Sequence, residues 1–171
     1  MNEPTIIEYL VADHVRLHDL LERAMSLPHL ELGAYAAFRR GLLRHIKIEE
    51  KVLFPAVREA RGGQALDRAH ELRVDHAALT SLLVSTPDLE LCREILALLS
   101  THDAKEEGVG GSYEECKRWL SDDELVLLAQ RARSLPEVRV AAYLHRPGVY
   151  RTAESALASA RRMPAPKKGI G

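Results

Sequence analysis

Apolar residues recur every three to four positions along four stretches between residues 5 and 108, which is the spacing of one face of an amphipathic helix. Short polar, glycine-containing or proline-containing segments separate these stretches. Because helices joined by only a few residues lie antiparallel, we expect an all-α protein built on an up-down antiparallel four-helix bundle. The predicted helices run from Thr5 to the Ser26-Leu27-Pro28 segment, from Glu31 to Arg61, from Gln64 to Ser85, and from Thr86-Pro87 to near Gly108.

The chain beyond the bundle is predicted to form a C-terminal helical extension. GVGGS (108–112) has the composition of a flexible connection, whereas Ser121 and Glu124 have the spacing of a capping box that begins a helix over 121–134. A last helix is expected over about 150–162, before the proline-rich and basic sequence RRMPAPKKGIG. The predicted division is a bundle at 1–110, an extension at 111–162 and a flexible basic tail at 163–171.

Composition supports the helical prediction and excludes several classes of function. Leucine and alanine are abundant while aromatic residues reach only 5%, and 46% hydrophobic with 29% charged residues is typical of a globular domain. The 24 basic and 25 acidic residues give a net charge of −1, which makes nucleic acid an improbable partner. No apolar run approaches the roughly 20 residues of a membrane-spanning helix, so no membrane partner is expected.

The first residues and the cysteines bear on the compartment. MNEPTIIEYL lacks a basic region followed by an apolar one, so we expect no secretory signal and a cytoplasmic location. Cys92 and Cys116 stand alone without a CxxC pair, which favours reduced packing residues, with a bridge between them left open.

Polar residues interrupt the apolar faces of all four predicted bundle helices. A single histidine at such a position is usually a hydrogen-bonded core residue, but six in-phase residues are hard to explain in that way. Counting from the turns places His14 level with His45 and Glu49 level with His76, and leaves His102 offset from His76 by about 5 residues, or about 7 Å of rise. The residues that interrupt the faces are His14, His45, Glu49, His76, His102 and Glu106.

Two buried carboxylates beside four imidazoles predict a metal site. An ionised glutamate in an apolar core costs several kcal/mol unless a cation compensates it. Nitrogen and oxygen donors of this kind suit iron, manganese or zinc, and bundle cores commonly hold two such ions. Glu49 and Glu106 are then the candidates to bridge two divalent ions.

The same residues carry a resemblance to a known family. His14 in ADHVRLHDLL, His45 and Glu49 in HIKIEEKVLFP, His76 in VDHAALTSLL, and His102 and Glu106 in HDAKEEG resemble the four helix signatures of the hemerythrin-like, or HHE cation-binding, family. The resemblance covers roughly residues 5–108. It implies two non-heme iron ions, oxo- or hydroxo-bridged, with both glutamates bridging and the histidines as terminal ligands.

Departures from the family pattern leave the ligand set open. Oxygen-carrying members have two histidines one turn apart on the third helix, but Leu72 and Thr80 occupy the positions four before and four after His76. A fifth histidine would have to be His18 or His70, with His18 the better candidate and His70 expected at the surface.

Four carboxylates are adjacent in sequence to the proposed ligands. Glu107 has the spacing that oxygen-carrying members show after the last histidine, whereas Glu106 fits the helix face. Glu50 and Glu107 are expected to be solvated or to orient a ligand histidine. Asp13 and Asp75 are expected to be ordinary surface charges.

These observations support one leading function and two alternatives. The leading hypothesis is a di-iron protein that binds dioxygen or another small ligand and acts in oxygen or redox sensing or in iron handling. An open iron position would instead suit an enzyme that reduces peroxide or nitric oxide, so enzyme activity is left undecided. The third hypothesis is a helical interaction module without metal, and the partner of the C-terminal extension is left open.

Overall fold

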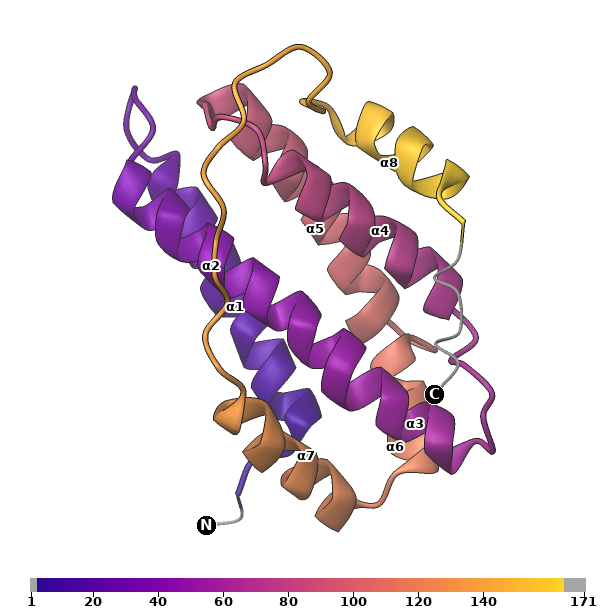
Figure 1. The fold of residues 1–171 in the computed structure, drawn as a ribbon. Helices are drawn as coiled ribbons and strands as arrows, with labels where there is room; N and C mark the ends of the chain where they lie inside the picture. Colours follow the sequence, from indigo (N-terminus) through magenta and orange to yellow (C-terminus); the bar gives the residue numbers. More distant parts are fainter. Residues whose placement is uncertain (1–2, 165–171) are drawn as a thin grey trace.

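The computed structural model describes residues 3–164 and is helical apart from its connections, with no strand among those residues. Figure 1 shows the long helices of the bundle running side by side, with shorter helices from the C-terminal third of the chain beside them. Part of the predicted tail, 165–171, lies outside the described residues. The elements are α1 (Ile6–Ala24), α2 (Leu32–Ile48), η1 (Glu49–Leu53), α3 (Phe54–Ala60), α4 (Ala69–Leu82), α5 (Leu89–Glu107), α6 (Ser112–Trp119), α7 (Asp122–Ser134) and α8 (Ala153–Arg162).

The four bundle helices confirm the predicted all-α, up-down architecture. The second is one continuous rod of α2, η1 and α3, in which η1 is a π-helical turn. Capping residues begin two of the helices as expected, since Thr5 and Ser121 both form capping boxes. The third bundle helix begins at Ala69, five residues after the predicted start at Gln64, because residues 64–68 form the end of the glycine turn.

One helix was not predicted. The segment GVGGS was expected to be flexible, but its last residue, Ser112, begins α6. Gly111 caps this helix, and Tyr113 and Cys116 bury its inner face. The helix of only eight residues is too short for its apolar period to be recognised in the sequence.

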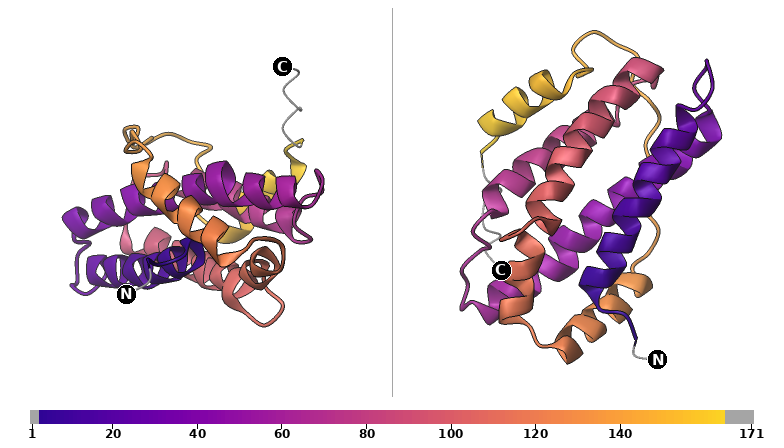
Figure 2. Two further views of the ribbon diagram at one scale, coloured as in Figure 1. Left: turned by 90° about the horizontal axis from the view of Figure 1, so that it is seen from below. Right: turned by 180° about the vertical axis from the view of Figure 1, so that it is seen from behind.

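Two apolar clusters fill the bundle, one on either side of the polar residues. The first cluster includes Leu17, Phe38 and Leu99, and the second includes Leu10 and residues of α6 and α7. Along α1, His14 therefore lies between a residue of the second cluster and one of the first. Figure 2 shows α7 (orange) crossing the end of the bundle near the N-terminus, where it covers the second cluster. The polar residues are thus enclosed by apolar packing.

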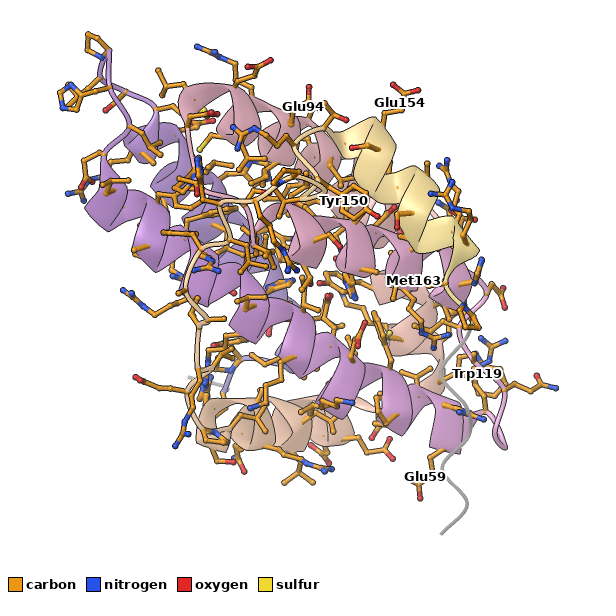
Figure 3. All side chains as sticks on the ribbon, turned by 45° about the horizontal axis from the view of Figure 1, so that its top comes forward. Glu59, Glu94, Trp119, Tyr150, Glu154 and Met163 are labelled. Carbon is orange, nitrogen blue, oxygen red and sulfur yellow. The ribbon has the colours of Figure 1, made fainter. Side chains whose placement is uncertain are left out.

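The extension returns along the bundle to α4. Arg39 and Arg44 of α2 donate hydrogen bonds to the carbonyls of Ala141 and Leu135, which hold the segment between α7 and α8 against the bundle. The carboxylate of Glu94 then accepts a hydrogen bond from the first residue of α8, and Figure 3 shows Glu94 close to this end of the helix. The division of the chain at residues 110 and 162 stays a prediction.

The connection between α4 and α5 takes up the offset expected between His76 and His102. His102 lies 13 residues after the start of α5, about 20 Å of helical rise, whereas His76 lies 6 residues before the end of α4, about 9 Å. Residues 83–88 are not helical and span the remaining ~10 Å, well within the reach of an extended chain of that length. The Nε2 atoms of the two histidines consequently lie 3.2 Å apart.

Among the helices within residues 3–164, none is both long enough and apolar enough to cross a lipid bilayer.

Candidate metal centre

The structure brings all six predicted site residues together between the two apolar clusters. They come from α1, from the junction of α2 and η1, from α4 and from α5, and none of them is more than 3% exposed. Their donor atoms form two groups that share both glutamates. The first group is His14, His45, Glu49 and Glu106, and the second is Glu49, His76, His102 and Glu106.

The first group has the dimensions of a metal site. His14 Nε2 and His45 Nε2 lie 2.9 Å apart, His14 Nε2 lies 3.3 Å from Glu106 Oε2, and His45 Nε2 lies 3.6 Å from Glu49 Oε1. Two donors bound about 2.1 Å from one ion at a right angle are about 3.0 Å apart. The separations therefore suit donors that point to one common centre.

The second group uses the other oxygen of each glutamate. Glu49 Oε2 lies 3.1 Å from His76 Nε2, and Glu106 Oε1 lies 3.3 Å from His102 Nε2. Each carboxylate thus presents one oxygen to each group, which is the arrangement of a ligand that bridges two ions.

Unpartnered oxygens indicate that a cation belongs in this space. Glu49 Oε2 and both carboxylate oxygens of Glu106 are buried and have no hydrogen-bond donor within residues 3–164. A buried anion without a donor costs free energy comparable to several hydrogen bonds, so native cores rarely contain one. Metal ions would supply the missing partners, and the residues present fit that group.

Carboxylates hold the outer nitrogens of the histidines. Asp13 Oδ2 lies 3.0 Å from His45 Nδ1, and Glu50 Oε1 lies 3.0 Å from His76 Nδ1. A histidine that donates from Nδ1 keeps its Nε2 lone pair free for a metal. This tautomer follows from the hydrogen-bond partners, because each outer carboxylate accepts a proton from Nδ1.

The other two histidines have equivalent partners. Asp75 Oδ2 lies 3.3 Å from His102 Nδ1, and Glu107 Oε1 contacts His14 Nδ1. Each of these four carboxylates is adjacent in sequence to a proposed ligand on its own helix. Each one binds a histidine on the neighbouring helix. The hydrogen bonds therefore close a ring from α1 to α2, from η1 to α4, from α4 to α5 and from α5 back to α1.

This ring corrects one prediction and decides another. Asp13 and Asp75 are not surface charges, because they are only 9% and 3% exposed and each binds a histidine. Glu50 and Glu107 orient histidines, as one of the two expected roles, and both side chains stay partly exposed to solvent. Sequence reasoning missed the aspartates because a residue next to an inward histidine lies about 100° away around the helix, a direction that periodicity assigns to solvent.

The π-helical turn places two adjacent carboxylates on one imidazole. The N–H of Phe54 donates to the carbonyl of Glu49, five residues back, which widens the helix locally. Glu49 then approaches Nε2 of His76 while Glu50 approaches Nδ1 of the same ring. The ring of Phe54 also stacks on this imidazole, with centroids 6.2 Å apart. No feature of the sequence distinguished this turn from a regular helix.

Protons and metal ions compete for the inward nitrogens. Burial disfavours a charged His45, but the charge of Glu49 and the hydrogen bond to Asp13 raise the pKa of His45 well above its usual value. Burial likewise opposes the charge on Glu49, but His45 and His76 hold the pKa of Glu49 well below its usual value. Glu49 is therefore anionic, and the site favours positive charge, whether that charge is carried by protons or by metal ions.

Tyr113 of α6 adds a hydrogen bond that the sequence did not indicate. Its buried hydroxyl donates to Glu49 Oε1 across 2.6 Å, and its ring stacks on that of His14 with centroids 5.9 Å apart. Tyr113 therefore positions a carboxylate of the site.

Replacing Tyr113 with phenylalanine tests this contact in the metal-free protein. The substitution leaves Glu49 Oε1 without its donor, so we expect the free energy of unfolding to fall by about 1–3 kcal/mol in urea titrations. Tyr35 is a matched control, because its hydroxyl is also buried but has no hydrogen-bond partner. Equal destabilisation by Tyr35→Phe and Tyr113→Phe would show that the hydrogen bond to Glu49 is not the cause.

The remaining histidines do not enter the two groups. His18 is half-buried and binds Asp103 rather than the shared centre, with Nε2 to Oδ2 at 2.7 Å. His70 and His29 are exposed, as expected for the former. His145 lies in the segment before α8, 3.4 Å from the hydroxyl of Thr86. Cys92 and Cys116 are both free and buried, in agreement with packing residues.

Comparison with known proteins agrees with the geometry. The family model of the hemerythrin HHE cation binding domain matches residues 5–123, which include every helix of the bundle and the unpredicted α6. Neither a search of curated proteins nor a search of solved structures found a match. Because the match covers well over half of the chain, this protein belongs to the hemerythrin HHE cation-binding domain family.

Proposed function

We propose that the two groups hold two iron ions and that the protein binds dioxygen or a related small ligand there. The ligands in this proposal are His14, His45, Glu49, His76, His102 and Glu106. The observation that carries it is the set of unpartnered oxygens of Glu49 and Glu106 among four inward Nε2 atoms. Membership of a cation-binding family supports the same assignment.

The charges around the centre support two divalent ions. The two central glutamates and the four carboxylates that bind the histidine Nδ1 atoms carry six negative charges. Arg16 and Lys105 neutralise two of these charges, through ion pairs with Asp13 and Asp75. A net negative charge remains, which two divalent ions would offset.

The protein's own residues would set the properties of such a centre. When bound, a pair of iron ions supplies electrons for the reversible reduction of a small ligand. The ring carboxylates hold the imidazoles in one tautomer and one orientation, and the two apolar clusters exclude water from the centre. A dry, rigid centre of this kind suits oxygen or redox sensing and iron handling.

Metal analysis with visible spectroscopy tests the proposal directly. We expect about two irons per chain after anaerobic loading with Fe²⁺, since each group offers two imidazoles and two carboxylate oxygens. Exposure to air should produce a visible absorption that degassing reverses. A protein that binds no metal under these conditions would be a helical module without a metal function, and steady consumption of peroxide with an electron donor would identify an enzyme instead.

A further inference from the structure

Asp103 and His18 form a hydrogen-bonded pair beside the first group. His18 Nε2 contacts Asp103 Oδ2 at 2.7 Å, and the other oxygen, Asp103 Oδ1, is buried without a hydrogen-bond partner. This oxygen lies 3.6 Å from His14 Nε2, the same separation as His45 Nε2 to Glu49 Oε1 within the group. Asp103 therefore shares with the two central glutamates an unpartnered, buried oxygen next to an inward imidazole nitrogen.

In the part of the chain that the structure describes, the second group lacks such a pair, although the two halves of the bundle are otherwise alike. Each half has Asp-His on its first helix and His-x-x-x-Glu-Glu on its second, beginning at Asp13 and His45 in one half and at Asp75 and His102 in the other. The position four residues after the Asp-His histidine is His18 in the first half but the exposed Thr80 in the second.

The position after the second-helix histidine differs in the same way. It is Asp103 on α5 but the apolar Ile46 on α2. Although α5 supplies His102 to the second group, Asp103 lies next to His14, at the edge of the first group and outside its four mutually close donors. The two candidate metal positions are therefore chemically unequal.

We propose that Asp103 binds the metal ion of the first position through Oδ1 and that His18 orients it. This inference rests on the proposed function, since it requires the two groups to hold metal. His18, one turn after His14, then contributes to the site by positioning Asp103 and is not itself a ligand. The second position keeps more of its coordination sphere for water or a small ligand, because no equivalent donor approaches it among the described residues.

Titration with Co²⁺, followed by calorimetry and visible absorption, separates the two positions. We expect Asp103→Ala and Asp103→Asn to weaken one of the two Co²⁺ sites by about 10- to 100-fold and to leave the other unchanged. The absorption of the weakened site should change in band position or intensity, because cobalt spectra report the number of donors. His18→Ala should produce a smaller loss at the same site, and Thr80→Ala, at the equivalent position of the other half, should produce none.

The outcomes distinguish this inference from the proposed function. Wild-type protein that binds no Co²⁺ would overturn both. Two unaltered sites in both Asp103 variants, or equal weakening of both sites, would overturn the role of Asp103 while leaving the dimetal centre intact. Circular dichroism checks the fold of each variant, and if Asp103→Ala loses helix, the isosteric Asp103→Asn decides.

Discussion

Replacing His45 and Glu49 together with alanine is expected to abolish metal binding at both positions, with affinity falling at least ~100-fold. The effect is expected to be larger than for any of the four carboxylates that bind the Nδ1 atoms. Glu49 presents one oxygen to each group, and His45 supplies one of the two imidazoles of the first group. Metal analysis by mass spectrometry after loading with Fe²⁺ and gel filtration measures the result.

A surface histidine provides the control for this experiment. His70 is exposed on α4, six residues from His76, so His70→Ala should retain as much metal as the wild type. Glu49→Gln keeps the shape of the side chain but removes its charge, and it should also lose metal while keeping its helix content. Equal metal loss in His70→Ala and in the double variant would contradict the assignment of the inward face.

Removal of the metal by a chelator is expected to lower Tm by about 15 °C or more. Each ion bound at a thousandfold excess over its dissociation constant stabilises the fold by about 4 kcal/mol, and a chain of this size loses about 2–4 °C per kcal/mol. Thermal unfolding followed by circular dichroism checks the shift, and adding Fe²⁺ back under nitrogen should restore the original Tm.

The Tm of the metal-free protein should also fall as pH rises from about 6.5 to 9. Burial opposes the charge on His102, but Glu106 and Asp75 raise its pKa to about 10. A histidine whose pKa is raised by folding stabilises the fold below its unfolded pKa, about 6.5, and loses that contribution as pH rises toward the folded value. For Glu49, whose pKa is lowered, the contribution is lost as pH falls below about 4.5.

The metal-loaded protein should not show this alkaline decline, because its bound nitrogens carry no proton to lose. The difference in Tm between the loaded and metal-free forms should therefore widen from pH 6.5 to 9. A metal-free Tm that rises over this range would show that the carboxylates do not hold protons on the histidines. His70→Ala should follow the wild-type curve, since this exposed residue has no part in the ring.

The fold could be predicted from the spacing of apolar residues. The six central residues could be predicted because each of them occupies a position that a leucine would otherwise fill. His45 and Glu49, for example, are four residues apart on a face that continues to Val52, and the three are almost fully buried. Periodicity reports which residues point inward, and it therefore identified the six residues that the structure brings together.

The supporting residues escaped prediction because their direction depends on a neighbouring helix. Asp13 points sideways along the boundary between α1 and α2, where it meets an imidazole nitrogen, and a single helix considered alone gives no sign of that contact. Tyr113 reaches Glu49 because α6 packs beside α5 and α3, which depends on packing between segments 64 residues apart. Periodicity along one helix contains neither kind of information.

The π-helical turn η1 determines what the deletion of one residue from this helix would change. A one-turn π bulge absorbs one extra residue locally, so that the helix before it and the helix after it keep their faces. Deleting one residue from η1 would restore a regular helix and still leave Val57 facing the core. The loss would fall on the adjacent carboxylates, because Glu49 and Glu50 could no longer both reach His76. A chain shortened in this way would still form the helical bundle but would lose the candidate metal centre. The deletion would therefore affect metal binding without affecting folding.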